Sequence, residues 1–236
     1  EGNAGSQFGS AVAISNNGII VSGAPQSSGE GLFKAGSVEV FVPLESGGYE
    51  GITLTAPDGA TSAFFGSTVS VNDAGLVIVG ASGDDDHGSQ SGSVYVYQPD
   101  DTGNYQAPVK LTLPDGLPYD QFGTSVTTNE AGVIVIGAQG TDGTSAEAGS
   151  VYVYIPTGQG EYGTPIQLTA SDATTRDGFG NSVAINEAGV IVVGASMDDA
   201  SASAAGSVYV YVPDGQGGYT QTKLIAADGA LGDMFG

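Results

Sequence analysis

The sequence predicts an all-β fold of the β-propeller type, built from four blades of about 57 residues with four strands each. Strand-like segments rich in Val, Ile and Tyr recur between turn residues throughout the chain. No segment keeps the helical period of about 3.6 residues, and Gly or Pro interrupts every window of helical length. Phe-Gly pairs recur at intervals of 57 residues, with 56 before the last pair: Phe8-Gly9, Phe65-Gly66, Phe122-Gly123, Phe179-Gly180 and Phe235-Gly236.

Each predicted blade begins with two strands joined by a tight turn. A short segment follows the Phe-Gly pair, and a continuous β-branched run comes next, in IIVSGA, LVIVGA, VIVIGA and VIVVGA. A continuous apolar run is typical of a strand that is buried on both faces. The turn carries Asn and Gly, which tolerate the positive φ that tight hairpins require. Its glycines are Gly18, Gly75, Gly132 and Gly189.

Two further strands complete the blade. The third starts at Gly-Ser-Val and alternates Val with Tyr or Phe, a period of two that places Val on one face and the aromatic residues on the other. Proline is expected to stop it, at Pro43, Pro99, Pro156 and Pro213. A Gly-rich turn leads into the fourth strand, in GITLTA, VKLTLP, IQLTA and TKLIAA.

A sheet with two apolar faces cannot bury them alone, so we expect the sheets to pack face to face around an axis. The predicted domain is residues 1–236, with repeats at about 8–64, 65–121, 122–178 and 179–234. The fifth Phe-Gly pair exceeds what a closed four-bladed ring needs. Three arrangements therefore stay open: part of a larger ring or array, a pairing of copies, or a four-bladed unit whose last pair is spare or links onward.

Composition excludes several functional classes. The chain has 26 acidic and 4 basic residues and a net charge of -22, which disfavours nucleic acid and anionic membranes. It has no Cys, which excludes disulfides, thiolate zinc sites and cysteine nucleophiles. No apolar run approaches the roughly 18 residues of a membrane helix. A start at Glu1 without Met is typical of a mature or excised segment.

The Phe-Gly start, the strand ending in Gly-Ala and the Gly-Ser-Val-Tyr-Val-Tyr strand together resemble the FG-GAP repeat. That repeat builds the propeller of integrin α subunits and occurs in many bacterial surface proteins. The likeness is closer to the bacterial versions, in which a loop such as Asp84-Asp85-Asp86-His87-Gly88-Ser89 precedes the third strand. It covers essentially the whole chain. The resemblance implies a propeller, an extracellular, cell-surface or periplasmic location, and a role in binding or adhesion.

The integrin-type repeat often holds calcium in a D-x-D-x-D-G loop between its first two strands. Here that loop is only Ser15-Asn16-Asn17-Gly18 and equally short in the other repeats, too poor in carboxylates for a calcium cage. Those sites are therefore not carried over.

The loop after Gly-Ala offers another calcium candidate, because clustered carboxylates repel one another unless a cation or water intervenes. The alternative, a solvated acidic loop, is favoured because a single acid recurs fully and Ser28 replaces it in the first repeat. The candidate ligands are Asp84, Asp85, Asp86, Asp142, Asp198 and Asp199.

Further acids precede the Phe-Gly pairs. One set lies seven residues before Phe, at Glu1, Asp58, Asp115, Asp172 and Asp228, and a second lies two before Phe, at Asp120, Asp177 and Asp233. The two sets together could chelate a cation. Turn formation is the favoured interpretation of the first set, since Asp side chains commonly bond turn amides.

Aromatic residues and the one histidine have structural interpretations as well. His87 lacks partners for a triad or a zinc site and is expected to be a loop residue, with metal ligation as the weaker hypothesis. The pairs Tyr95/Tyr97, Tyr152/Tyr154 and Tyr209/Tyr211 favour packing between blades over a sugar-binding surface. The residues Phe8, Phe65, Phe122 and Phe179 are predicted to lie in the blade core.

These patterns favour an extracellular structural or adhesion-type interaction module without catalytic activity. It would self-associate or form part of a longer surface protein, and it would bind a protein or glycan ligand without nucleic acid or membrane insertion. The alternative is a calcium-dependent ligand- or glycan-binding propeller, with calcium as the suggested cofactor. An enzyme with its site in the ring channel is disfavoured, because catalytic propellers break repeat symmetry to bring unlike residues together.

Overall fold

The computed structural model describes residues 5–28, 31–113, 115–143, 145–158, 160–199 and 202–236, and within these ranges it contains strands and turns but no helix. The chain divides into two compact units, Glu1–Gly123 and Thr124–Gly236. The division falls two residues after the predicted end of the second repeat, so each unit contains two predicted repeats. Within the described ranges there is no apolar helix long enough to cross a membrane.

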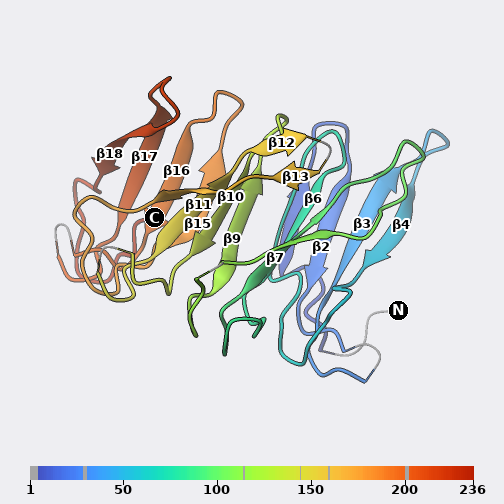
Figure 1. The fold of residues 1–236 in the computed structure, drawn as a ribbon, viewed down its shortest axis with the longest axis horizontal. Helices are drawn as coiled ribbons and strands as arrows, with labels where there is room; N and C mark the ends of the chain where they lie inside the picture. The colour runs from blue at the N-terminus through green and yellow to red at the C-terminus, as the bar shows by residue number, and fades with distance from the viewer. Residues whose placement is uncertain (1–4, 29–30, 114, 144, 159, 200–201) are drawn as a thin grey trace. The chain divides into compact units, whose positions relative to one another are not determined.

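Unit 1 contains two four-stranded antiparallel meanders, here called blade 1 and blade 2 (Figure 1). Blade 1 is β1 (Ala11–Ile14), β2 (Ile20–Ala24), β3 (Ser37–Pro43) and β4 (Tyr49–Leu54). Blade 2 is β5 (Thr68–Val71), β6 (Val77–Ala81), β7 (Ser93–Tyr97) and β8 (Val109–Leu111). In both blades the strands hydrogen-bond in chain order, as the sequence predicts for a propeller blade.

Unit 2 contains blade 3 and blade 4. Blade 3 is β9 (Phe122–Thr128), which starts on the last two residues of unit 1, with β10 (Ile134–Ala138), β11 (Ser150–Tyr154) and β14 (Ile166–Leu168). Blade 4 is β15 (Phe179–Ile185), β16 (Ile191–Ala195), β17 (Ser207–Pro213) and β18 (Tyr219–Leu224). A small hairpin of β12 (Pro156–Gly158) and β13 (Glu161–Tyr162) was not predicted and extends the β11–β14 connection.

The tight turns between the first two strands follow the predicted chemistry. In blade 2 the Asn72 side chain accepts a hydrogen bond from the Leu76 amide at 3.0 Å, and Gly75 has a φ of 77°. Because an L side chain is strained at such a φ, glycine suits this position. In blades 1 and 4 the third strand ends on its predicted proline. Pro43 is the last residue of β3, and Pro213 is the last residue of β17.

The apolar cores lie between neighbouring blades of each unit. In unit 1, Val21, Val38 and Val40 of blade 1 pack against Val77 and Val79 of blade 2. The matching core of unit 2 joins Val135, Val151 and Val153 to Ile191 and Val193. The prediction that sheets with two apolar faces bury them against each other is confirmed within each unit.

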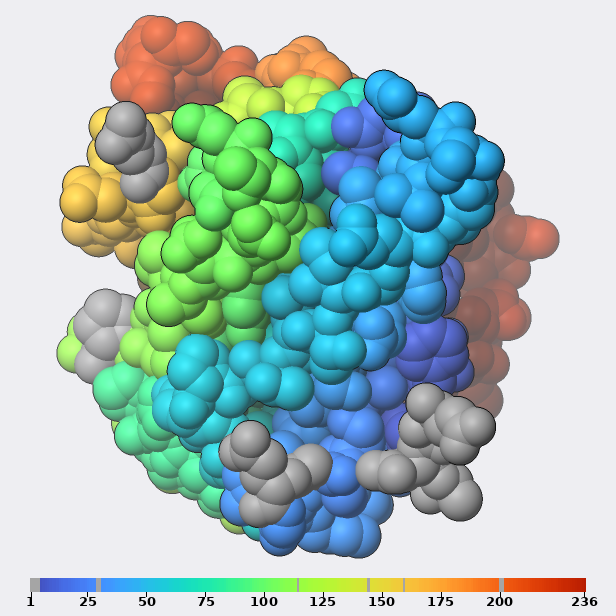
Figure 2. All heavy atoms as spheres, turned by 90° about the vertical axis from the view of Figure 1, so that its right-hand side faces the viewer, coloured from blue at the N-terminus to red at the C-terminus, as the bar shows by residue number. Residues whose placement is uncertain are grey.

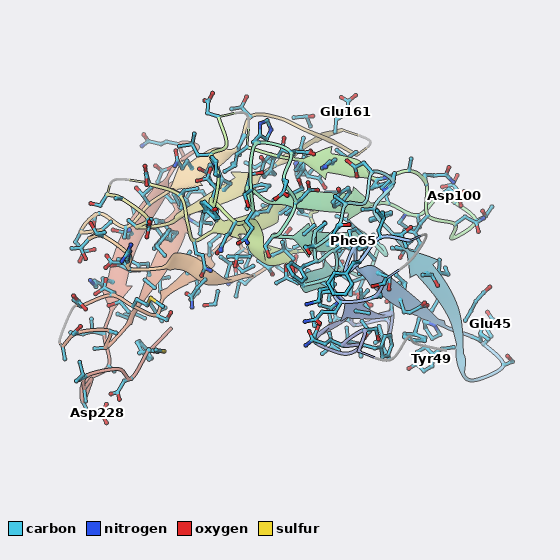
Figure 3. The ribbon with its side chains drawn as sticks, turned by 90° about the horizontal axis from the view of Figure 1, so that it is seen from below. Glu45, Tyr49, Phe65, Asp100, Glu161 and Asp228 are labelled. Carbon is cyan, nitrogen blue, oxygen red and sulfur yellow. The ribbon has the colours of Figure 1, made fainter. Side chains whose placement is uncertain are left out.

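The Phe-Gly pair fixes how one blade meets the next. Phe65, labelled in Figure 3, is fully buried. Its ring lies edge-on to those of Tyr95 and Tyr97, with centroid distances of 5.3 and 6.1 Å. The glycine of the pair approaches blade 1 closely: a Cβ at Gly66 would lie 2.8 Å from the Ser37 carbonyl oxygen, and a Cβ at Gly23 of blade 1 would lie 2.0 Å from the Gly66 carbonyl oxygen. The backbones therefore touch at this point, and a side chain would force the blades apart.

Two predictions about aromatic residues come out differently. The interpretation of the Tyr pairs as inter-blade packing is confirmed for Tyr95, Tyr97, Tyr209 and Tyr211, which are buried in the two cores. The prediction that Phe8 lies in the core is wrong, because its side chain is 54% exposed. Its ring meets that of Phe41 at a centroid distance of 6.4 Å, and Phe8 is not part of the core that blades 1 and 2 share.

Candidate functional site

The acids singled out in the sequence gather around a lysine in blade 2. Strand pairing places Lys110 of β8 directly opposite Tyr95 of β7. The loop after β6 brings in Asp84 and Asp86, and the segment after β4 brings in Asp58. The Lys110 Nζ lies 2.6 Å from Asp58, 3.1 Å from Asp84 and 2.6 Å from Asp86.

Tyr95, whose ring lies in the core, hydrogen-bonds two of these carboxylates. Its hydroxyl lies 2.7 Å from Asp58 Oδ1 and 3.0 Å from Asp84 Oδ2, so one proton is shared between two acceptors. The Lys110 ammonium also lies 5.2 Å from the centroid of the Tyr95 ring, within the range of a cation–π contact. The buried Asp84 is thereby compensated by a hydroxyl and an ammonium group.

Proton affinities in the cluster reflect this pairing. Burial acts to raise the pKa of Asp58, but hydrogen bonds from Lys110 and Tyr95 and the lysine charge outweigh it, so the pKa is lowered. Burial acts to lower the pKa of Lys110, and its three carboxylate partners outweigh that effect and raise it. Burial, followed by the two carboxylates, raises the pKa of Tyr95. The cluster is therefore an ion network and not an acid–base pair poised near neutral pH.

Blade 4 repeats the arrangement with one acid fewer. Lys223 of β18 pairs with Tyr209 of β17, and its Nζ lies 2.7 Å from Asp172 and 2.8 Å from Asp198. The Tyr209 hydroxyl lies 2.8 Å from Asp172 and 2.7 Å from Asp198. Equivalent residues therefore make the same network in two blades.

The other two blades fill the same place with neutral donors. In blade 3, the Gln167 side-chain amide donates to Ser150 at 3.1 Å and to Tyr152 at 3.3 Å. In blade 1, the Thr53 hydroxyl donates to the Glu39 carboxylate. The lysine and the buried aspartate thus occur together or not at all, as expected when each compensates the other.

The aspartate that recurs five residues after the Gly of Gly-Ala accepts a hydrogen bond from a backbone amide of the same loop. Asp85, Asp142 and Asp199 each accept a hydrogen bond from a backbone amide five residues later, at 2.7, 3.1 and 2.7 Å. The donors are Gln90, Glu147 and Ala204, all of which have a positive φ. In blade 1 the Ser28 hydroxyl accepts from the Lys34 amide at 3.1 Å in the same way. The carboxylate therefore secures a strained loop residue.

The acids before Phe-Gly divide between two roles. Asp120 and Asp177 are buried and accept from the amide three residues earlier, Leu117 at 2.7 Å and Thr174 at 2.6 Å. Asp233 accepts from Ala230 in the same way at 2.7 Å. Asp58 and Asp172 belong to the lysine networks, and Glu1 lies outside the described residues. The acids of the two sets whose contacts are described thus make separate contacts, with lysines or with turn amides.

The six candidate calcium ligands make two kinds of contact. Asp84, Asp86 and Asp198 face lysines, whereas Asp85, Asp142 and Asp199 close loops. Within the described part of the chain, no group of three or more Asp, Glu or His side chains is arranged to hold a metal ion. The signal that could have indicated the networks is the lysine in VKL and TKL, at the same position of two repeats.

His87 is placed as a loop residue. Its Nε2 lies 3.4 Å from the Thr112 hydroxyl, and its backbone amide donates to the Ser91 hydroxyl at 3.1 Å. These contacts are those of a loop side chain, and metal ligation at His87 stays a hypothesis.

Unit 1 also contains a cavity and an aromatic patch. The blue to green atoms that face the viewer in Figure 2 belong to this unit. The cavity has a volume of about 340 Å³ and is lined by Leu32, Ala35, Gly36, Thr55, Ala56, Pro57, Asp58 and Gly59. Beside Leu32, the Lys34 ammonium lies 5.2 Å from the Phe33 ring and 5.9 Å from the Phe64 ring. We call Phe33, Lys34 and Phe64 the aromatic patch.

Comparison with known protein families gives one match, to the FG-GAP repeat, over residues 50–97, 106–154 and 165–211. The matched segments make up more than half of the chain. Each runs from the fourth strand of one blade through the Phe-Gly pair to the third strand of the next, which is the junction that fixes blade packing. No curated protein matches the chain.

Proposed function

We propose, from the premise that the chain belongs to the FG-GAP repeat family, that it is an extracellular or cell-surface interaction module and not an enzyme. The observation that carries the proposal is the aromatic patch. Phe33 is exposed, and Lys34 lies between two aromatic rings on a loop of an otherwise strongly acidic chain. An exposed aromatic and cationic group on a rigid scaffold is typical of a recognition surface.

The loop that presents the patch is held in place by the backbone. The Ser62 amide donates to the Phe33 carbonyl at 2.9 Å, and the Phe64 amide donates to the Lys34 carbonyl at 3.3 Å. Such anchoring lowers the conformational entropy lost on binding. The patch chemistry suits a ligand with an apolar or sugar face next to an acidic group, which a surface protein or an acidic glycan provides.

Binding of the labelled protein to an array of acidic and neutral glycans and to immobilised extracellular proteins tests the proposal. Wild-type protein should bind at least one of these classes, and the double change Phe33→Ser with Lys34→Ser should weaken binding at least tenfold. Leu231→Ser, which removes an exposed apolar side chain on a loop of unit 2, is the matched control and should bind as wild type does. Equal binding by all three proteins would refute a role for the patch, and turnover of ester, phosphate or glycoside substrates would refute the non-enzymatic assignment.

Calcium-dependent ligand binding is the second candidate. The contacts of Asp58, Asp84 and Asp86 with one ammonium group motivate it, since calcium also takes carboxylate oxygens as ligands, although these three carboxylates are not arranged as a metal site in the described residues. Against it, the Lys110 ammonium occupies the place that a cation would take. Calorimetric titration with calcium separates the possibilities: heat with wild-type protein supports a calcium site. Heat only after Lys110→Met supports a site that the lysine blocks, and no heat with either protein removes this candidate.

A further inference from the structure

The serine that begins the third strand has a buried hydroxyl group in both blades that carry a lysine network. Ser93 begins β7, Ser207 begins β17, and both side chains are fully buried. Among the described residues, the hydroxyl oxygen of neither serine has a hydrogen-bond partner. Burying a hydroxyl group without a partner is unfavourable, and such groups are rare in folded proteins. Two of them at the same position of two repeats therefore indicate a partner outside these residues.

The same serine has a protein partner in the other two blades. In blade 1 the Ser27 hydroxyl donates to the Ser37 hydroxyl at 2.8 Å. In blade 3 the Gln167 side-chain amide donates to the Ser150 hydroxyl at 3.1 Å. Ser27 belongs to the loop after the second strand, and Gln167 belongs to the fourth strand, β14. Two neighbouring positions can therefore supply a partner, and blades 2 and 4 hold charged residues at both.

Asp84 holds in blade 2 the loop position that Ser27 holds in blade 1. In both blades the glycine before the serine donates its amide to the carbonyl of this residue, from Gly36 to Ser27 at 3.0 Å and from Gly92 to Asp84 at 2.9 Å. The Asp84 carboxylate oxygen Oδ2, however, contacts a tyrosine hydroxyl and the lysine ammonium. Asp84 is therefore placed beside Ser93, but its described side-chain contacts are with the network.

Lys110 holds the strand position of Gln167. Strand pairing places Lys110 opposite Tyr95 and Gln167 opposite Tyr152, and the serine lies two residues before each tyrosine. Residues two apart in a strand have their side chains on the same face. The Lys110 ammonium has three N–H donors and contacts three carboxylates. Ser93 therefore lies next to an aspartate and a lysine that are bonded to each other.

Blade 4 repeats this combination. Ser207 lies two residues before Tyr209, which pairs with Lys223, and the Gly206 amide donates to the Asp198 carbonyl at 2.9 Å. The Lys223 ammonium contacts the Asp198 carboxylate, as Lys110 does in blade 2. Within the described ranges, the serine hydroxyl thus lacks a protein partner in the two blades with a lysine network, and it has one in the two blades with neutral residues at these positions.

We propose that each lysine network binds one buried water molecule, which accepts a hydrogen bond from the serine hydroxyl and donates one to the aspartate carboxylate. The water joins Ser93 to Asp84 in blade 2 and Ser207 to Asp198 in blade 4. A water molecule both donates and accepts, a carboxylate can accept about four hydrogen bonds, and buried waters usually bond to polar groups that lack another partner. A metal cation is repelled from this place by the ammonium group, which lies 3.1 Å from Asp84 and 2.8 Å from Asp198.

A high-resolution crystal structure of the wild-type protein tests the proposal directly. It should show one water at about 2.5–3.0 Å from the Ser93 hydroxyl and from the Asp84 carboxylate, and an equivalent water between Ser207 and Asp198. A metal ion at either place, a direct bond from either serine to a protein group, or the lack of a water at either serine would overturn the proposal.

Ser93→Ala tests the proposal in solution. A hydroxyl group that is bonded to water stabilises the fold, so its removal should lower the melting temperature, whereas removal of a buried hydroxyl without a partner should raise it. Magnetic relaxation of water nuclei counts long-lived internal waters, and the variant should hold one fewer than the wild type. Ser37→Ala, the matched control in blade 1, removes a direct bond between two serines and should leave this count unchanged.

Ser207→Ala repeats both measurements in unit 2, so the test does not depend on the folding of a single variant. A raised melting temperature or an unchanged count of internal waters in either the Ser93 or the Ser207 variant would contradict the buried water. A lowered melting temperature together with the loss of one water in each variant would support it.

Discussion

Replacing Lys110 by methionine removes the ammonium group that three carboxylates share in blade 2, while keeping most of the apolar stem. Among these contacts, Asp84 would then keep only the hydrogen bond from the Tyr95 hydroxyl, 3.0 Å away, to offset the cost of burying its negative charge. Its side chain is 6% exposed, against 20% for Lys110, so water cannot replace the lost partner at little cost. We expect blade 2 to lose stability locally.

The size of the loss follows from this burial. Removing one partner of a fully buried ion pair costs about 3–5 kcal/mol. Asp58 and Asp86 are half-exposed and can be hydrated once the lysine is gone, and exposed pairs contribute only about 0–1 kcal/mol. The decrease in the free energy of unfolding therefore comes mainly from the buried Asp84, and we expect it to be about 2–3 kcal/mol. This corresponds to roughly a 30- to 150-fold change in an opening equilibrium.

Native-state hydrogen exchange measures this opening strand by strand. Amides of β7 should lose protection by that factor in Lys110→Met, whereas those of β17 in blade 4 should not change. Lys34→Met removes the same charge from a residue that makes no ion pair with a carboxylate of the described residues, and it should alter protection in β7 by less than about threefold. A change in Lys110→Met no larger than in Lys34→Met would refute the role assigned to the network.

Two further predictions concern blade packing and acid stability. Gly23→Ala should destabilise unit 1 by at least about 2 kcal/mol, since its Cβ would meet the Gly66 carbonyl at 2.0 Å. Gly51→Ala, whose Cβ would meet its nearest neighbours only at the van der Waals distance of 3.8 Å, should change the denaturation midpoint little. The pKa values of Asp58 and Asp172 are lowered in the folded state, so their stabilisation is present above about pH 4 and lost as the pH falls through the folded-state values. Acid titration of the melting temperature should show this loss below about pH 4, and a flat profile there would contradict the paired state of these carboxylates.

The strand order could be predicted from the sequence because its signals are local. The continuous apolar run at residues 77–81 forms β6, and the Val/Tyr alternation at 93–97 forms β7. Both strands are buried as expected. The β12–β13 hairpin carries no such signal, since Pro156 and Gly158 are residues of turns. Its pairing depends on contacts that a pattern of apolar residues does not encode.

The roles of the acids could not be predicted, because they depend on strand register. That Tyr95 faces Lys110 follows only from the pairing of β7 with β8. The exposure of Phe8 has a related cause: its local sequence matches that of Phe65, but only Phe65 lies in the core that blades 1 and 2 share. A repeat pattern predicts the strands of each blade but not which residues cover it.

A crystal structure determined from crystals soaked in calcium, with anomalous scattering data, tests the account most directly. Its central claim is that lysine ammonium groups, and not metal ions, compensate the buried aspartates of blades 2 and 4. The account predicts density for Lys110 Nζ between Asp58, Asp84 and Asp86, and no anomalous peak there. A calcium peak bound by these three carboxylates, with the lysine turned away, would contradict it.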